Sequence, residues 1–153
     1  MTQQPRSRIA PAGEPATLTV TASGAAPLQY QWRKDGANLT DDGHYQGVTT
    51  PTLTIYPVAP VDAGIYDVVI TNSCGTVTSL GAVLTVREPG DLNCDGAVNF
   101  GDINPFVLLL ACRSCYTQQY PQCEWILGDL NHDGQITFAD INPFVARLSS
   151  PPD

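Results

Sequence analysis

A segment that occurs twice near the C terminus constrains the fold of this chain more than any other feature. Residues 90–107 and 128–145 both begin with Gly-Asp-Leu-Asn, continue through Asp-Gly, and end with Asp-Ile-Asn-Pro-Phe-Val. Because so many positions match, the two segments must fold as copies of one small unit. The region beyond about residue 90 is therefore expected to consist of two short loop-and-helix repeats.

Oxygen-bearing side chains recur at alternate positions in each copy, and a glycine follows the third of them. Gly96 and Gly134 stand where a sharp turn needs a positive φ. Ca²⁺ is a hard cation that takes about six to eight oxygen ligands, which this spacing can supply. We therefore predict two Ca²⁺ ions, one in each loop. The predicted ligands are Asp91, Asn93, Asp95, Ala97 (through its carbonyl), Asn99 and Asp102, and then Asp129, Asn131, Asp133, Gln135 (through its carbonyl), Thr137 and Asp140.

A single Asp-x-Asn-x-Asp-Gly run can also be a solvated turn, because Asp, Asn and Gly favour turns without any ligand. The two copies are both complete, and each is closed by an aspartate, Asp102 or Asp140. This completeness favours a pair of metal-binding loops over a pair of ordinary turns.

Each loop is expected to lead into a short helix, over residues 105–112 and 143–149. Asn104 and Asn142, each followed by Pro, would be the N-caps, because Asn at the cap and Pro at the first helical position favour a helix start. An apolar stripe follows in each copy. We expect the stripes to pack the two repeats together, with the alternative that part of them faces a partner. Their members are Phe100, Ile103, Phe106, Val107 and Leu110, and Phe138, Ile141, Phe144, Val145 and Leu148.

Before residue 87 the sequence has a different period, with polar and apolar residues alternating in runs that turn signals separate. These runs are rich in Thr, Val, Ile and aromatic residues, as strands prefer. Strands at this spacing indicate an all-β sandwich of two sheets. The predicted strands cover residues 16–22, 28–34, 52–56, 66–71 and 82–86.

Two aromatic residues carry a family resemblance in this region. Trp32 lies in the predicted strand at residues 28–34, and Tyr66 follows an Asp-Ala-Gly turn. This pattern resembles an immunoglobulin-like domain, which has a core Trp on its third strand and a tyrosine corner. The family often has an inter-sheet disulfide, but Val20 and Val68 stand at the corresponding positions. The resemblance implies a sandwich over residues 10–87 that relies on packing around Trp32, and it says little about function.

The aspartates that close the two loops carry a second resemblance. EF-hand sensors usually close with Glu, and here no convincing helix precedes either loop. A duplicated loop–helix unit closed by Asp resembles a dockerin, the module that attaches enzymes to cellulosome scaffolds. The resemblance covers residues 90–149 and implies a cohesin-like protein receptor. The implied receptor-contacting residues are Phe100, Gly101, Phe138 and Ala139.

Four of the five cysteines lie between residues 94 and 123. Such a cluster in a small module indicates disulfides and an oxidising compartment. We predict a bond between Cys94, inside the first loop, and Cys123. Cys112 and Cys115 form either a local bridge or a free pair, and a zinc site would need Cys94 as its fourth ligand. Cys74 stands apart, as a free thiol or an intermolecular linker.

Charge and motifs narrow the function classes. A net charge of −8 argues against nucleic acid or an anionic membrane as the main partner. No apolar run is long enough to span a bilayer, and the start of this chain does not read as a signal peptide. Because the sequence has no nucleophile elbow, P-loop or His-Glu-x-x-His motif, we predict no catalytic residues and a protein that is not an enzyme.

These observations predict two domains, an all-β immunoglobulin-like sandwich and a small α dockerin-like domain with two calcium loop–helix repeats. We expect an extracellular or cell-surface attachment module that binds a protein receptor and does not insert into a membrane. One alternative is the non-catalytic end of a larger secreted polysaccharide-degrading enzyme, which would reach polysaccharide through its parent protein. Another is a calcium sensor or buffer. The expected boundaries are a flexible N terminus at 1–9, the sandwich at 10–87, a linker at 88–90, the dockerin-like domain at 91–149 and a tail at 150–153.

Overall fold

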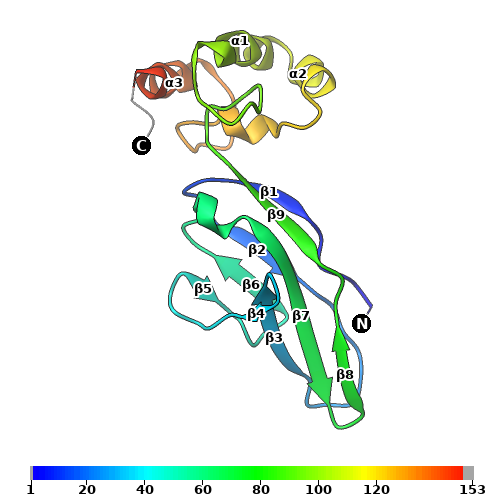
Figure 1. Cartoon of the computed structure of the whole chain (residues 1–153). Coiled ribbons are helices and arrows are strands. Elements are labelled where there is room, and N and C mark those ends of the chain that lie inside the picture. Colours follow the sequence, from blue (N-terminus) through cyan, green and yellow to red (C-terminus); the bar gives the residue numbers. More distant parts are fainter. Residues whose placement is uncertain (1, 150–153) are drawn as a thin grey trace. The chain divides into compact units, whose positions relative to one another are not determined.

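The computed structural model describes residues 2–149, and the chain divides into two compact units, Met1–Val86 and Arg87–Asp153 (Figure 1). The tail expected at residues 150–153 lies outside the described residues. The first unit is built from strands and the second from helices and turns, as the change of sequence period predicts.

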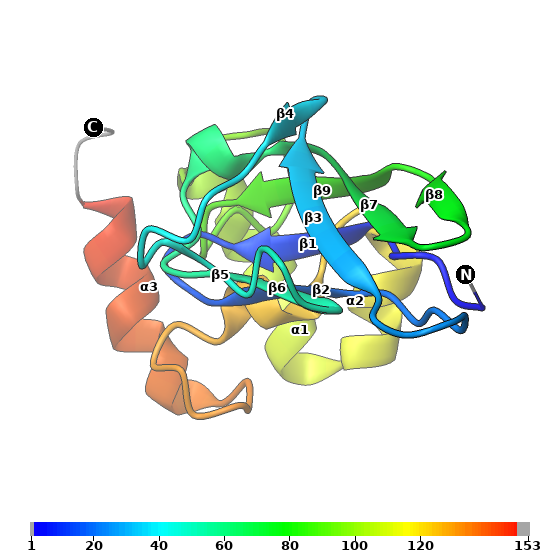
Figure 2. The same ribbon diagram turned by 90° about the horizontal axis from the view of Figure 1, so that it is seen from below.

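The first unit contains two sheets. The larger is six-stranded, with the order β1-β9-β7-β3-β4 and with β8 paired to β7; the smaller has the order β2-β6-β5, whose strands lie side by side in Figure 2. All pairings between β2 and β6 and between β3 and β7 are antiparallel. The strands are β1 (Arg8–Pro11), β2 (Ala16–Thr19), β3 (Gln29–Lys34), β4 (Ala37–Asn38), β5 (Tyr45–Gln46), β6 (Thr52–Ile55), β7 (Gly64–Asn72), β8 (Gly75–Thr78) and β9 (Ala82–Arg87).

The core of the sandwich lies where the alternating pattern places it. Along β2, burial alternates with exposure, so that one face of the strand packs inward. Trp32 on β3 is fully buried and is paired in register with Val68 on β7. Val20 and Val68 are both buried in the same cluster, so apolar packing occupies the positions where related domains often have a disulfide. The predicted all-β immunoglobulin-like sandwich is confirmed for this unit.

The segment expected to be a flexible N terminus, residues 1–9, is not free over its described part. The backbone N–H groups of Thr2 and Gln3 donate to the carbonyl of Thr21, at 2.8 and 3.1 Å. Arg8 begins β1, which pairs with β9 at the edge of the larger sheet. The sequence pattern misses this strand because it is only four residues long and contains a single fully buried side chain, Ala10.

The second unit contains three helices among its described residues, α1 (Ile103–Ala111), α2 (Arg113–Gln119) and α3 (Ile141–Leu148). The sequence predicts α1 and α3 but not α2, which has only one buried residue, Tyr116. Without an apolar stripe, a short polar helix leaves no period-3.6 signal in the sequence.

Helices α1 and α3 begin two residues earlier than predicted, so the predicted N-caps Asn104 and Asn142 lie inside the first turn. A 3-10 turn ends at Asp102 or Asp140 and runs directly into the α-helix. The proline after each Asn therefore lies at the third helical position. It is tolerated there because the first four N–H groups of a helix have no intrahelical partner.

The expected linker at residues 88–90 belongs to the second unit. The N–H of Gly90 donates to the carbonyl of Leu127 at 2.8 Å, and the N–H of Asp91 donates to the carbonyl of Glu88 at 3.1 Å. Gly90 has a φ of +100°, a conformation that side chains rarely adopt. These bonds fix the entry into the first loop.

Candidate metal centre and docking face

The closing carboxylate organises the first loop. Asp102 is fully buried. Its Oδ1 accepts hydrogen bonds from the N–H groups of Leu92 (2.7 Å) and Asn93 (3.0 Å), and its Oδ2 accepts one from Asn99 (2.9 Å). One side chain therefore joins the start of the loop to its end.

The second loop repeats this arrangement. Asp140 Oδ1 accepts from the N–H groups of Leu130 (2.9 Å) and Asn131 (3.1 Å), and Oδ2 accepts from Thr137 (2.9 Å). Asp140 is also fully buried. The two copies thus share the hydrogen bonds of the closing carboxylate, but at the first position only Asp129 Oδ1 has a donor, the N–H of Asp133 at 3.1 Å. The fifth position is again alike in the two loops. Asp133 Oδ1 accepts from the N–H of Gln135 at 2.9 Å, as Asp95 does from Ala97 at 3.0 Å.

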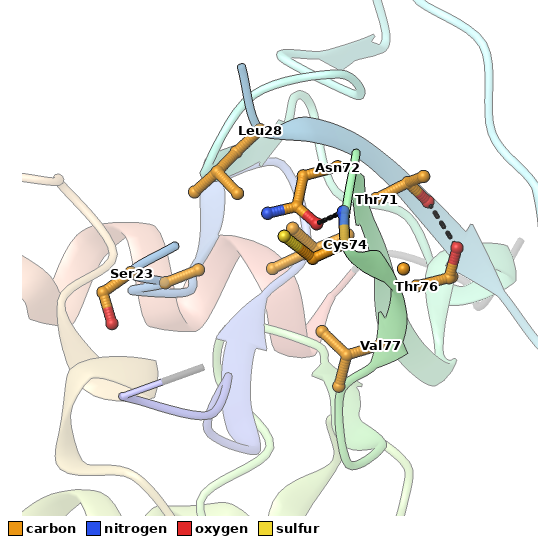
Figure 3. A pocket seen from close by; sticks show the side chains of 10 residues that line it. Ser23, Leu28, Thr71, Asn72, Cys74, Thr76 and Val77 are labelled. Atoms are coloured by element: carbon orange, nitrogen blue, oxygen red, sulfur yellow. Dashed lines mark hydrogen bonds between the residues drawn. The ribbon is translucent and has the colours of Figure 1, made fainter. Parts of the chain in front are cut away.

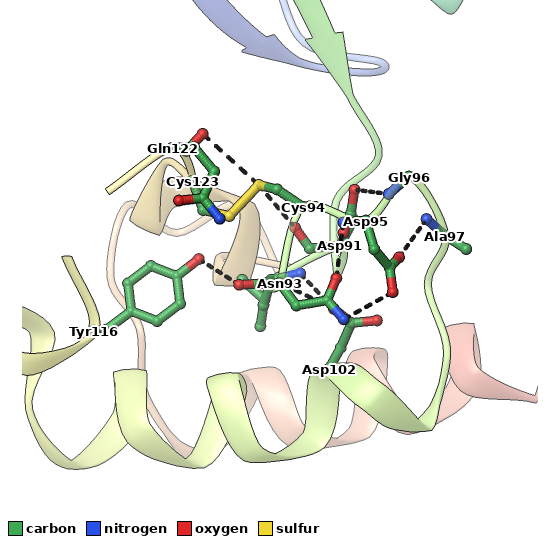
Figure 4. The surroundings of a disulfide bond; sticks show 11 residues. Asp91, Asn93, Cys94, Asp95, Gly96, Ala97, Asp102, Tyr116, Gln122 and Cys123 are labelled. Atoms are coloured by element: carbon green, nitrogen blue, oxygen red, sulfur yellow. Dashed lines mark hydrogen bonds between the residues drawn. A yellow bond between two sulfur atoms is a disulfide. The ribbon is translucent and has the colours of Figure 1, made fainter. Parts of the chain in front are cut away.

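Asp91, the first predicted ligand, has an unsatisfied oxygen. Its Oδ2 accepts a hydrogen bond from the N–H of Gly96 at 3.1 Å, whereas its buried Oδ1 has no hydrogen-bond partner. Burial raises the pKa of the Asp91 carboxyl. The Gly96 hydrogen bond and the charge of Arg87 lower this pKa, and the charges of Asp102 and Asp95 raise it, so the net shift is upward. Figure 4 shows these carboxylates together with the amide of Asn93. A buried carboxylate oxygen with no donor is costly unless a cation approaches it.

The donor set fits a hard cation better than a soft one. Each loop contributes only oxygen atoms, from carboxylates, Asn or Thr side chains and main-chain carbonyls, and oxygen is the donor that Ca²⁺ prefers. Within residues 2–149, no three His, Cys, Asp or Glu side chains already form a cluster that could hold a metal by themselves. The amide and main-chain oxygens must therefore complete any site in these loops.

The residues at the ninth loop position cap the following turn. The Asn99 side chain accepts from the N–H of Gly101 at 2.7 Å, and Thr137 Oγ1 accepts from the N–H of Ala139 at 3.1 Å. The sequence predicts both residues only as ligands. Their role as caps also has a signal in the sequence, since Asn or Thr followed three residues later by an acid is typical of a capping box.

Glycine at the sixth loop position is confirmed in its predicted conformation, with φ of +96° at Gly96 and +82° at Gly134. The fourth position is also left-handed, with φ of +58° at Cys94 and +60° at His132. The residue types at this position do not predict the left-handed conformation. Non-glycine residues seldom adopt the conformation, so each loop has to hold it in place.

Disulfides join Cys94 to Cys123 and Cys112 to Cys115 in this structure. The first bond links the first loop to the segment between the repeats, which is the pairing predicted from the sequence (Figure 4). The second is the local bridge, one of the two possibilities that the sequence leaves open. Cys74 is exposed and is not bonded to another cysteine.

A tyrosine outside the predicted site residues supports the first loop. Tyr116 on α2 is fully buried, and its hydroxyl donates to the carbonyl of Leu92 at 3.0 Å. Burial raises the pKa of Tyr116, and the charges of Asp91 and Asp102 raise it further, so the hydroxyl stays a donor at neutral pH. The residue between the first two side-chain ligands is thereby anchored to α2.

The apolar stripes divide into a buried and an exposed half. Phe106 and Phe144 are buried and stack on each other, with ring centroids 4.4 Å apart, so the predicted packing of the two repeats holds for this part. Leu109, which is absent from the predicted stripe, is also buried. Leu110 and Leu148 are partly buried against the same core. The other six stripe residues lie on the surface. They are Phe100 (79% exposed), Ile103, Val107, Phe138 (81% exposed), Ile141 and Val145.

The exposed half includes two of the predicted receptor-contacting residues. Phe100 and Phe138 lie in the 3-10 turns that lead into α1 and α3, with Gly101 and Ala139 beside them. Side chains three and seven residues after each Phe continue the exposed row along its helix. An exposed apolar surface of this kind is typical of a protein-binding face.

The first unit has a buried polar cluster around Asp62. Its Oδ1 lies 2.9 Å from His44 Nε2 and accepts from the Tyr45 hydroxyl at 2.9 Å, and its Oδ2 accepts from the N–H of Ala59 at 2.8 Å. The Tyr66 hydroxyl donates to the carbonyl of Asp62 at 2.8 Å, which is the predicted tyrosine corner. These bonds satisfy the cluster and fix a corner of the sandwich.

Cys74 lies in the turn between β7 and β8, where its N–H donates to Asn72 Oδ1 at 2.9 Å. The thiol borders a pocket that also involves Leu28 and Val77 (Figure 3). Among the described residues that line this pocket, no second titratable side chain lies beside the thiol.

A two-sheet sandwich with a buried Trp and a tyrosine corner defines the class of immunoglobulin-like domains. The immunoglobulin I-set domain model matches residues 1–86. The chain belongs to this family. No dockerin or EF-hand family model matches the C-terminal part.

Relatives with similar sequences are much longer proteins. Cartilage intermediate layer protein 2 of Mus musculus is 35% identical over 96 residues, which are 62% of this chain and 8% of that protein. Contactin of Drosophila melanogaster is 37% identical over 73 residues, 47% of this chain and 5% of that protein. The chain thus covers less than a tenth of the length of these relatives.

Solved structures show the same fold for the first unit. The I-band fragment I67–I69 from titin superposes with a TM-score of 0.53 at 31% identity, covering 57% of this chain and 32% of that one. The tandem Ig repeats of Dlar give a TM-score of 0.53 at 27% identity, with 57% and 46% covered. No helix of the described residues is long and apolar enough to cross a bilayer.

Proposed function

We propose that this chain is an extracellular, non-catalytic attachment module in which an immunoglobulin I-set domain carries a docking unit structured by two Ca²⁺ ions. The observation that carries the calcium assignment of the first loop is the buried Asp91 Oδ1, which lacks any hydrogen-bond donor within a loop of oxygen ligands. The second ion is assigned from the sequence repeat, because Asp129 Oδ1 already accepts from the N–H of Asp133. A bound cation would give this oxygen a partner and would offset the repulsion among Asp91, Asp95 and Asp102.

The residues that would hold the first ion are Asp91, Asn93, Asp95 and Asp102, with the carbonyl of Ala97. The second loop offers the same donors in the same order, and its closing Asp140 makes the same three backbone bonds as Asp102. Ca²⁺ supplies positive charge that draws both halves of each loop together. Folding of the second unit is therefore linked to calcium binding.

The disulfides and the proposed calcium sites support an extracellular setting. Two disulfides occur within a unit of fewer than 70 residues, and disulfides persist mainly in oxidising compartments. Calcium is abundant outside cells, where modest affinity suffices to fill such loops. The matched family also includes parts of large multidomain proteins, which is consistent with a module that joins other domains to a partner.

The docking face is the exposed apolar row on each repeat, which begins at Phe100 and at Phe138. Because the closing aspartate of each loop is the last residue of the turn that presents the Phe, calcium binding and docking share one element. The proposed partner is a protein receptor of the cohesin type, as the dockerin resemblance implies.

A direct binding experiment tests this function. The full chain, loaded with calcium, is passed over immobilised cohesin-type receptor domains, and the dissociation constant is measured by surface plasmon resonance. The paired change Phe100→Ala and Phe138→Ala is expected to weaken binding by about tenfold or more, because each removes a large exposed contact residue. A chelator is expected to abolish binding.

The control is the pair Val61→Ala and Leu80→Ala, which removes exposed apolar side chains from the first unit instead. This variant should bind within about twofold of the parent. Binding that survives the chelator, or that is lost equally in the control, would contradict the proposed docking face.

A further inference from the structure

The two closing aspartates make the same three hydrogen bonds, but only the first loop is held by a disulfide. Cys94 occupies the fourth loop position and is bonded to Cys123, with a Cα–Cα distance of 5.9 Å. His132 occupies that position in the second loop, with nearly the same left-handed backbone. Among the described residues no disulfide reaches the second loop.

The anchor of this bond lies in a well-packed segment. Cys123 is buried, and its N–H donates to the carbonyl of Tyr120 at 3.0 Å. Tyr116, which belongs to the same segment as Cys123, donates its hydroxyl hydrogen bond to the carbonyl of Leu92. The region between the repeats therefore contacts the first loop at Leu92 and at Cys94, on either side of the predicted ligand Asn93.

Holding Cys94 restricts its two neighbours directly. Asn93 and Asp95 are both predicted ligands, and they adjoin the residue whose left-handed conformation is rarely populated in a free chain. A crosslink at Cys94 reduces the number of conformations open to the metal-free loop. The loop therefore loses less conformational entropy when an ion binds. Preorganisation of this kind raises affinity without adding a ligand.

We propose that the Cys94–Cys123 disulfide sets the calcium affinity of the first loop alone, so that this loop responds to redox state and the second does not. This inference rests on the proposed calcium function. It assigns the cysteine in the loop a regulatory role that the repeat itself does not require.

The reductant that would release the first loop is a dithiol. One of its thiolates attacks the Sγ of half-buried Cys94, the S–S bond breaks, and Cys123 leaves as a thiolate. The second thiol of the reductant then attacks the mixed disulfide and frees Cys94. Two electrons pass to the protein, the two protons of the dithiol end on Cys94 and Cys123, and the dithiol becomes a cyclic disulfide.

Calorimetric calcium titration of the full chain tests the proposal with one loop disabled at a time. Asp133→Ala leaves only the first loop competent, and Asp95→Ala leaves only the second. In the Asp133→Ala chain, adding Cys94→Ser and Cys123→Ser is expected to weaken calcium binding by about tenfold or more. In the Asp95→Ala chain, the same pair of serines is expected to change affinity by less than about twofold.

The matched control is Cys112→Ser with Cys115→Ser, which removes a disulfide outside the loops and should leave both affinities unchanged. Equal first-loop affinity with and without the Cys94–Cys123 bond overturns the proposal. A loss of calcium affinity in both loops also overturns the proposal, because the bond would then stabilise the whole unit and not the first loop alone. Absence of binding in both single-loop chains refutes the calcium function itself.

Reduction of the Asp133→Ala chain provides a second readout. After treatment with a dithiol, this chain should lose calcium affinity by the same factor as the serine pair, and reoxidation should restore it. A reduced chain that binds as tightly as the oxidised one contradicts redox control.

Discussion

Asp62 and Asp91 are both buried carboxylates, but only one of them has donors for both oxygens. The Asp62 oxygens face His44, Tyr45 and the N–H of Ala59, so its charge is stabilised inside the sandwich. Asp91 has a donor for Oδ2 alone. This difference separates a structural corner from the loop in which we propose a bound cation.

The Asp62 cluster predicts acid sensitivity of the first unit. Burial works against the charged form, but the hydrogen bonds from His44, Ala59 and Tyr45 outweigh it and lower the pKa of Asp62. A carboxyl with a lowered folded-state pKa contributes stability above its unfolded-state pKa, near 4, and loses it as pH falls through the folded-state value. Asp62→Asn should cost about 1–3 kcal/mol at pH 7 and flatten the stability profile below about pH 4.

Urea unfolding at several pH values, followed by the β-sheet circular dichroism signal, measures this effect. Asp67→Asn is the control, since it breaks only the partly exposed pair with Arg33. That change should cost less than about 1 kcal/mol. An Asp62→Asn chain with the parent's acid slope would show that another group controls acid unfolding.

At the residue scale, the sequence predicts the loop donors because their spacing is set by the chemistry of the ion. It also predicts Gly96 and Gly134, since only a positive φ fits the turn. It does not predict the left-handed backbone at Cys94 or the anchoring bond of Tyr116. Both depend on contacts made across the fold, and residue type alone does not encode them.

At the element scale, helices α1 and α3 show why a stripe is not the same as a buried face. The repeats meet through Phe106 and Phe144, which lie at the same position in each copy. Each of these short helices buries only the side that faces the other repeat. Val107 and its counterpart Val145 therefore stay exposed. The sequence predicts the helices, whereas their partner determines which residues become buried.

Packing between the repeats predicts unequal effects of two neighbouring substitutions. Phe106→Ala removes a buried ring from the stack and should destabilise the second unit by about 3–5 kcal/mol. Val107→Ala removes an exposed side chain and should change stability by less than about 0.5 kcal/mol. Thermal unfolding followed at the helical circular dichroism band reports the second unit, because helices α1, α2 and α3 all belong to it. Similar losses in both variants would mean that the stack does not hold the repeats together.

At the scale of the whole molecule, the two units differ in what stabilises them. The first has a continuous apolar core around Trp32, which needs no ligand. The second has a smaller core and carries four buried aspartates, Asp91, Asp102, Asp129 and Asp140. Such a unit is expected to depend on calcium and on its disulfides.

Removal of calcium should therefore act on one unit only. Differential scanning calorimetry of the full chain is expected to show a transition of the second unit that moves to lower temperature with a chelator. At calcium concentrations about 100 times the dissociation constant, each site adds about 2.7 kcal/mol of stability. The transition of the first unit should stay in place. A chelator that shifts both transitions equally, or neither, would contradict this division.

Isothermal titration calorimetry of the full chain with calcium tests the proposed loops most directly. We expect two bound Ca²⁺ ions per chain, with Asp95→Ala and Asp133→Ala each removing one of them and the double variant binding none. No saturable calcium binding at millimolar concentrations, or binding that both substitutions leave intact, would contradict the assignment of these loops.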